Sequence, residues 1–149
     1  MFEILLNNII PFVIILTILV FVHELGHYSI ARYNDVKVEV FSIGFGKELF
    51  GFTDKSGTRW KFSLIPLGGY VKMHGDLDEA SSKKSTKNIN PEDSFHEKTL
   101  NQRSWMLFAG PAANFIFSFI ILIFINSYYG YSENIPKISY IDQDKSAYK

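Results

Sequence analysis

Two long runs of uncharged, mostly apolar residues lie towards the two ends of the chain and enclose a polar segment. The runs cover residues 4–22 and 104–132, and every charged side chain lies outside them. A run of about 18 or more such residues is long enough to cross a bilayer as an α-helix. Aromatic residues lie near both ends of the second run, as in the aromatic belts of membrane surfaces: Trp105 at one end and Tyr128, Tyr129 and Tyr131 at the other. The pattern therefore predicts an α-helical membrane protein with two transmembrane helices.

A cleavable signal peptide is the alternative for the first run. Signal peptides begin with basic residues, have an apolar core of about 7–15 residues and end at a small-residue cleavage site. This chain begins Met-Phe-Glu, its first run is longer, and no such cleavage site follows. These features favour a retained helix.

The polar segment between the runs shows the two-residue alternation that is typical of half-buried strands. Residues 36–40 and 59–64 alternate apolar and polar side chains, and glycines punctuate the connection between them. The sequence Pro-Leu-Gly-Gly at 66–69 predicts a break before a third short strand at 70–73. We therefore expect a small three-stranded β-sheet, followed by a flexible polar connector that is rich in Ser and Lys.

These patterns divide the chain into five parts: a first transmembrane helix at 1–31, a sheet region at 32–74, a connector at 75–99, a second transmembrane helix at 100–132 and a polar tail at 133–149. All Lys and Arg residues except Lys137, Lys145 and Lys149 lie between the two apolar runs. The positive-inside tendency predicts a cytoplasmic loop, although this rule weakens for loops beyond roughly 60 residues.

The composition excludes several classes of protein. The chain has 149 residues and no Cys, which excludes a disulfide scaffold, a thiolate zinc finger and a cysteine nucleophile. Its 15 basic and 15 acidic residues give zero formal net charge, whereas a nucleic-acid-binding protein would show a basic excess. We therefore expect membrane lipid, and no nucleic acid, among its partners.

The sequence His23-Glu24-Leu25-Gly26-His27 directly follows the first apolar run. On a helix, residues four apart share a face, so both imidazoles can reach one Zn²⁺ ion. Zinc lowers the pKa of a bound water to about 7, and Glu24 is placed to take that water's proton. Ionisable groups at the end of a membrane helix cost free energy to bury, so their presence there indicates a functional role. The alternative is a polar patch that simply ends the span.

Three further polar residues are weaker candidates. His74 and His96 lie at a strand end and in the connector, and we interpret both as solvated or locally bonded. Asn114 interrupts the second apolar run within Gly-Pro-Ala-Ala-Asn at 110–114. A lone amide at this depth predicts a hydrogen bond between helices, a place in the cavity of the metal site, or both.

Taken together, these motifs resemble the site-2 protease family of intramembrane zinc metalloproteases, in particular its bacterial regulator-of-sigma-E-protease branch. The matching stretches are 23–27, 41–46, 66–73 and 109–115, in the order in which the family has them. The resemblance implies that His23 and His27 bind zinc, that Glu24 is catalytic, and that the strands form a membrane-associated sheet which presents the substrate. It also implies an inner-membrane enzyme that cuts transmembrane segments of other proteins, with Asn114, Gly68 and Gly69 as candidates for binding substrate or lining the cavity.

The sequence departs from the family after the second run. Family members take a third zinc ligand from an Asp on a later span, and the only later Asp residues here, Asp142 and Asp144, lie in the polar tail. Residues 135–141 resemble the first strand of the family's PDZ domain. We therefore expect the amino-terminal portion of such a protease, from a split, truncated or decayed gene. It would either be completed by a separately made carboxy-terminal half or persist as an inactive, at most substrate-binding, remnant.

Overall fold

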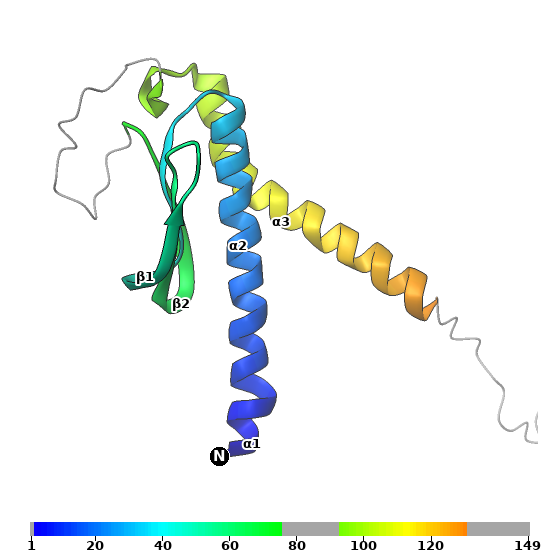
Figure 1. Cartoon of the computed structure of the whole chain (residues 1–149). Helices are drawn as coiled ribbons and strands as arrows, with labels where there is room; N and C mark the ends of the chain where they lie inside the picture. Colours follow the sequence, from blue (N-terminus) through cyan, green and yellow to red (C-terminus); the bar gives the residue numbers. More distant parts are fainter. Residues whose placement is uncertain (1, 76–92, 131–149) are drawn as a thin grey trace, which may run out of the picture. The chain divides into compact units, whose positions relative to one another are not determined.

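The computed structural model describes residues 2–75 and 93–130, which form two long helices and a β-sheet between them in the chain (Figure 1). In chain order the elements are α1 (Phe2–Ile4), the π-helix η1 (Leu5–Ile9), α2 (Ile10–Tyr33), β1 (Val38–Thr53), β2 (Arg59–Met73), the 3-10 helix η3 (Phe95–Glu97) and α3 (Leu100–Tyr129). Most of the expected connector and the expected PDZ-like tail at 133–149 lie outside the described residues. By its contacts the chain forms two units, Met1–Phe119 and Ile120–Lys149.

Two continuous helical stretches, Leu5–Tyr33 and Leu100–Tyr129, are long and apolar enough to cross a membrane. Large apolar side chains along both of them are exposed, among them Phe12, Ile15 and Phe115. Apolar surface of this extent is favourable against lipid and unfavourable against water. By length and composition, these helices and the small sheet between them confirm the predicted fold class.

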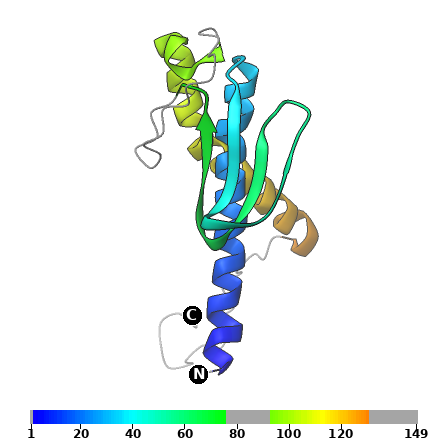
Figure 2. The ribbon, with the colours of Figure 1, turned by 60° about the vertical axis from the view of Figure 1, so that its left-hand side comes forward.

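The sheet differs from the expected three strands, because it is built from two long strands that each bend. β1 and β2 form a two-stranded antiparallel sheet. Because of the bends, residues 40–43 of β1 have partners on both sides, at 69–72 and at 59–62, while residues 48–53 pair with 59–63. The extended segments therefore lie in the order 69–73, 38–45, 59–65 and 48–53 across the sheet (Figure 2).

The expected break at 66–69 is wrong, because these residues lie inside β2. Gly69 pairs with Ile43, so the strand has resumed its pairing before the Pro-Leu-Gly-Gly sequence ends. Pro66 lies at the bend, where its carbonyl oxygen is 3.4 Å from the Thr17 hydroxyl of α2. A proline is tolerated at such an irregular position because the regular ladder needs no donor from it there.

An aromatic cluster holds the sheet against α2. The Tyr28 ring contacts the rings of Trp60 and Phe41 at centroid distances of 5.0 and 5.8 Å, and Phe21 lies 5.9 Å from Phe41. Phe41 and Trp60 stack on each other at 4.3 Å. Since Phe21 and Tyr28 flank the His-Glu motif, this cluster fixes the sheet at the level of the candidate site.

A small apolar core ties the sheet to both helices at the polar end of α2. Its buried members come from α2, the segment that leads into β1, β1 itself, β2 and α3: Ala31, Val36, Val38, Met73 and Met106. The Thr58 hydroxyl donates to the carbonyl oxygen of Val38 at 2.9 Å, which fixes the turn between the strands against this core. The core therefore anchors α2, the strand ends and the first turns of α3 to one another.

Candidate metal centre

His23 and His27 lie one turn apart on α2, as the motif predicts, and their imidazoles converge. The two Nε2 atoms are 3.2 Å apart. Two nitrogens that each lie about 2.0–2.1 Å from a tetrahedral zinc ion are about 3.3 Å apart. The pair therefore fits two of the positions around one zinc ion.

The backbone of α3 orients the second imidazole. The carbonyl oxygen of Met106 lies 2.7 Å from His27 Nδ1. A carbonyl oxygen only accepts hydrogen bonds, so Nδ1 of His27 must donate and its Nε2 keeps a free lone pair. A ligand histidine is commonly held by a hydrogen bond of this kind on its other nitrogen.

Two glycines bring α3 close to the imidazoles. A Cβ on Gly110 would lie 2.7 Å from His23 Nε2 and would overlap His27 Nε2, so the absent side chain leaves room for the two imidazoles beside α3. A Cβ on Gly26 would overlap the carbonyl oxygen of Ala109 and lie 2.7 Å from Ala113 Cβ. The close helix crossing and the space beside the imidazoles therefore both depend on glycine.

Asn114 reaches the first imidazole from α3. Its Nδ2 lies 3.4 Å from His23 Nδ1, so it bonds between helices and also lies at the site. Its Oδ1 is buried and has no hydrogen-bond partner among the described residues. Beside it is an open cavity of about 350 Å³, lined by His23, Pro111, Asn114, Phe115 and Ser118.

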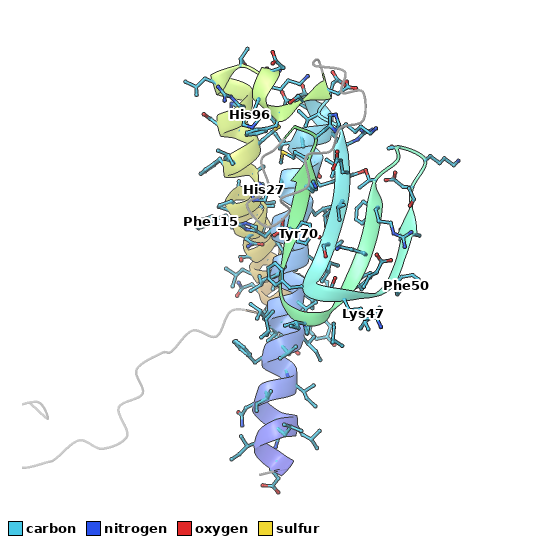
Figure 3. All side chains as sticks on the ribbon, turned by 90° about the vertical axis from the view of Figure 1, so that its left-hand side faces the viewer. His27, Lys47, Phe50, Tyr70, His96 and Phe115 are labelled. Atoms are coloured by element: carbon cyan, nitrogen blue, oxygen red, sulfur yellow. The ribbon has the colours of Figure 1, made fainter. Side chains whose placement is uncertain are left out.

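Glu24 lies on a different side of α2 from the two histidines, towards the sheet. A Cβ on Gly69 would lie 3.0 Å from Glu24 Cγ, so the backbone of the sheet's edge segment passes beside the carboxylate side chain. Gly68 has a φ of +153°, and a Cβ there would overlap the ring of Phe45. In Figure 3, Tyr70 marks this edge beside α2, whereas Phe50 lies at the far side of the sheet and Lys47 at its lower end.

The remaining histidines lie away from the pair. His74 is buried and its Nδ1 lies 2.7 Å from Glu39 Oε1, so it is locally bonded, while His96 is exposed in η3. Within residues 2–75 and 93–130, no group of three or more His, Cys, Asp or Glu side chains could hold a metal ion. The described part of the chain therefore offers two protein ligands, His23 and His27.

Sequence reasoning missed three features of α3 at this site: the Met106 carbonyl, the space at Gly110 and the cavity wall at Ser118. A backbone carbonyl carries no signal in the sequence. Ser118, however, follows Asn114 by four residues, and the spacing of four on a helix could have placed both on one face.

A helix that carries His-Glu-x-x-His after a long apolar stretch, with a second apolar helix beside its imidazoles, is typical of a metallopeptidase with membrane-spanning helices. Comparison with known proteins agrees. The model of peptidase family M50 matches residues 11–146, and the chain belongs to this family. The predicted site-2 protease relationship is thereby confirmed.

The chain is also similar to curated bacterial proteins that are named as putative zinc metalloproteases. A Rickettsia conorii protein is 50% identical over 131 residues, which are 88% of this chain and 36% of that protein. A Rhizobium meliloti protein is 43% identical over 143 residues, 93% of this chain and 38% of the relative. A Helicobacter pylori protein is 48% identical over 114 residues, which are 76% of this chain and 31% of that protein. The chain therefore spans less than half the length of these relatives.

Proposed function

We propose that this chain provides the histidine pair, the catalytic glutamate and the substrate-holding sheet of an intramembrane zinc metalloprotease. Such an enzyme would hydrolyse peptide bonds in membrane-embedded segments of other proteins. The observation that carries the proposal is the convergence of the two Nε2 atoms, 3.2 Å apart and beside Gly110, on a helix of spanning length. The family and the names of the relatives support it.

His23 and His27 would hold the zinc ion, with further ligands from outside the described residues or from a separately made carboxy-terminal half. When bound, zinc supplies Lewis-acid activation of the scissile carbonyl and of water. Met106 and Gly110 support this role, because the first orients one imidazole and the second leaves room for the ion. A catalytic zinc site needs three protein ligands, so two imidazoles alone should hold the ion weakly.

Glu24 would act as general base and then as general acid. It would take a proton from the attacking water and pass it to the leaving amine nitrogen. A helical substrate must first be unwound, because its carbonyl groups are engaged in hydrogen bonds. The edge segment 69–73 could hold the opened substrate by strand addition, since it is paired with β1 on one side and passes beside Glu24. Gly68 and Gly69, which have no side chains, would let the substrate backbone approach this edge closely.

The chain would lie in the bacterial inner membrane, with the sheet on the cytoplasmic side. The family and the two helices of spanning length support a membrane location. The basic residues between the two helices favour the cytoplasmic orientation. His23 and His27 would then lie near the cytoplasmic end of the first span.

A second candidate is a membrane protein that binds substrate without cutting it. It is favoured by one observation, the two-ligand limit of the described residues. In this case the sheet edge would still capture an extended segment.

One experiment separates the two candidates. The probe is a reporter with one apolar span between two soluble tags, reconstituted in vesicles with the chain and zinc. The assay is run with the chain alone and with the carboxy-terminal remainder of the Rickettsia conorii relative. We expect the wild-type chain to cleave the reporter, with the products read by mass spectrometry. The matched control Glu3→Gln should cleave it as well, because Glu3 lies at the opposite end of the first span from Glu24.

Glu24→Gln should lower the cleavage rate about 100-fold or more, because an amide cannot relay the proton. Cleavage by this variant at the wild-type rate would remove Glu24 from its proposed role. Crosslinking of the reporter to residues 69–73 without cleavage in either arm would favour the non-catalytic candidate.

A further inference from the structure

Neighbouring side chains of the edge segment 69–73 point to opposite faces of the sheet. Gly69 faces α2, since a Cβ on it would lie 3.0 Å from Glu24 Cγ. Tyr70 therefore points away from α2, to the face that is turned to the viewer in Figure 3. Side chains that lie directly opposite each other on paired strands share a face. A strand added to this edge would therefore present every second side chain to the face that carries Tyr70.

Two lysines place positive charge on this outer face beside the edge. Ser42 pairs with Tyr70 on one side and with Lys61 on the other, so the three side chains share the face. The Lys61 ammonium nitrogen lies 5.1 Å from the centroid of the Tyr70 ring. Lys72 follows Tyr70 by two residues, and its ammonium nitrogen lies 3.6 Å from a carboxylate oxygen of Glu39. Both cations are therefore held beside the edge segment.

Glu39 balances only part of this charge. Its other carboxylate oxygen lies 2.7 Å from His74 Nδ1, so Lys72 and His74 share one acid. Lys61 is paired with no carboxylate in the described part of the chain. The two lysines therefore leave an excess of positive charge on the outer face. A side chain of an added strand that points to this face is attracted if it is acidic and repelled if it is basic.

We propose that Tyr70, Lys61 and Lys72 form a specificity site for an acidic side chain of the substrate strand. The inference rests on the proposed function, in which a substrate strand adds to residues 69–73. A Glu directly opposite Tyr70 would be a diagonal neighbour of Lys72, and diagonal neighbours about 7–8 Å apart are within reach of long side chains. The substrate residues on either side of this Glu point to α2 and its proposed catalytic carboxylate, which repels acids. The site therefore selects extended segments in which an acid alternates with uncharged residues.

Photocrosslinking of the reporter to the zinc-free wild-type chain in vesicles tests the proposal without requiring cleavage. The reporter carries a photoreactive side chain in its apolar span, and a single Glu or Lys is placed in turn at successive positions beside it. The yield of crosslinks to residues 69–73 is read by mass spectrometry. At every second position Glu should give a yield about 3-fold or more above that of Lys, since ion pairs near a surface change binding by a few-fold. At the positions between, this preference should be absent.

Charge reversal in the chain itself gives the second test. Lys61→Glu combined with Lys72→Glu should reverse the preference, so that Lys gives the higher yield at the same alternate positions. Lys61→Glu alone keeps the contact between Lys72 and Glu39 and should weaken the preference, which provides a test should the double variant fail to insert. The matched control is Lys47→Glu combined with Lys55→Glu, the same change of net charge at exposed positions outside the edge segment. It should keep the wild-type preference.

The outcomes separate this proposal from the proposed function. Crosslinks to residues 69–73 with equal yields for Glu and Lys at every position would overturn the specificity site and retain strand addition. Absence of such crosslinks with every reporter would overturn the proposed strand addition and the specificity site with it. The vesicles are made from neutral lipid alone and with added anionic lipid. A loss of crosslinking in Lys61→Glu that requires anionic lipid, and is equal for both reporters, would overturn the proposal in favour of a lipid head group at the two lysines.

Discussion

The substitution Gly110→Ala tests whether the space beside the two imidazoles is the place of the metal ion. In the interior of a helix, glycine is roughly 0.5–1 kcal/mol less favourable than alanine, so propensity alone would make the variant more stable. The new Cβ would, however, lie 2.7 Å from His23 Nε2 and overlap His27 Nε2. It would therefore occupy the space towards which both lone pairs must point to share an ion.

The size of the effect follows from the cost of forcing a methyl group against atoms that lie too close to it, which is about 1–3 kcal/mol. At about 1.4 kcal/mol per factor of ten, this predicts zinc binding that is about 5- to 150-fold weaker. The helix itself should remain, because the ring of His23 or His27 can turn away from the methyl group.

Zinc affinity can be measured in detergent by competition with a chromophoric chelator, and helix content by circular dichroism. The matched control is Ser127→Ala, which changes helix propensity at an exposed position of the same helix. It should bind zinc as wild type does. Wild-type zinc affinity in a fully helical Gly110→Ala protein would refute the assignment of this space to the metal.

Two further predictions concern the packing of α2 and the sheet. Gly26→Ala should lower the free energy of unfolding by about 1–3 kcal/mol, measured by urea titration, because its Cβ would overlap the carbonyl oxygen of Ala109; an unchanged midpoint would contradict the close crossing. The pH dependence of the sheet's stability should depend on Asp54. Slight burial raises the pKa of this carboxyl group. Hydrogen bonds from Trp60 and two backbone N–H groups outweigh the burial and lower the pKa below its ordinary value. The charged form therefore stabilises the folded sheet above the unfolded pKa of about 3.9, and this stabilisation is lost as the pH falls through the lower, folded pKa. Fluorescence of Trp60 in a Trp105→Phe background should report that loss, and Asp54→Asn should remove the pH dependence; an Asn variant with the wild-type profile would show that another group is responsible.

The sequence predicts the helices and the histidine pair because both depend on local rules. An uncharged run longer than the bilayer core specifies a helix, and a spacing of four brings His23 and His27 to one face. The sheet was only partly predictable, since alternation marks extended segments but does not show that β1 and β2 each bend and pair twice. The contacts of α3 were the least predictable. The Met106 carbonyl and the missing Cβ of Gly110 act through backbone geometry. That geometry depends on how α2 and α3 cross, and the contacting residues His27 and Met106 are 79 positions apart in the sequence.

The arrangement of α2 explains how one short motif could serve both the proposed metal site and the proposed substrate. Phe21, Glu24 and Tyr28 follow one another at intervals of three and four, so they share the face that meets the sheet. His23 and His27 share the neighbouring face, which meets α3 together with Gly26. The proposed base and the proposed ligands are therefore held by the same turn of helix, while the sheet and α3 are fixed to it from different sides. It follows that a change in the aromatic cluster should displace the sheet edge from Glu24 without separating the two Nε2 atoms, whereas a change at Gly26 should move α3 from the imidazoles and leave the sheet in place.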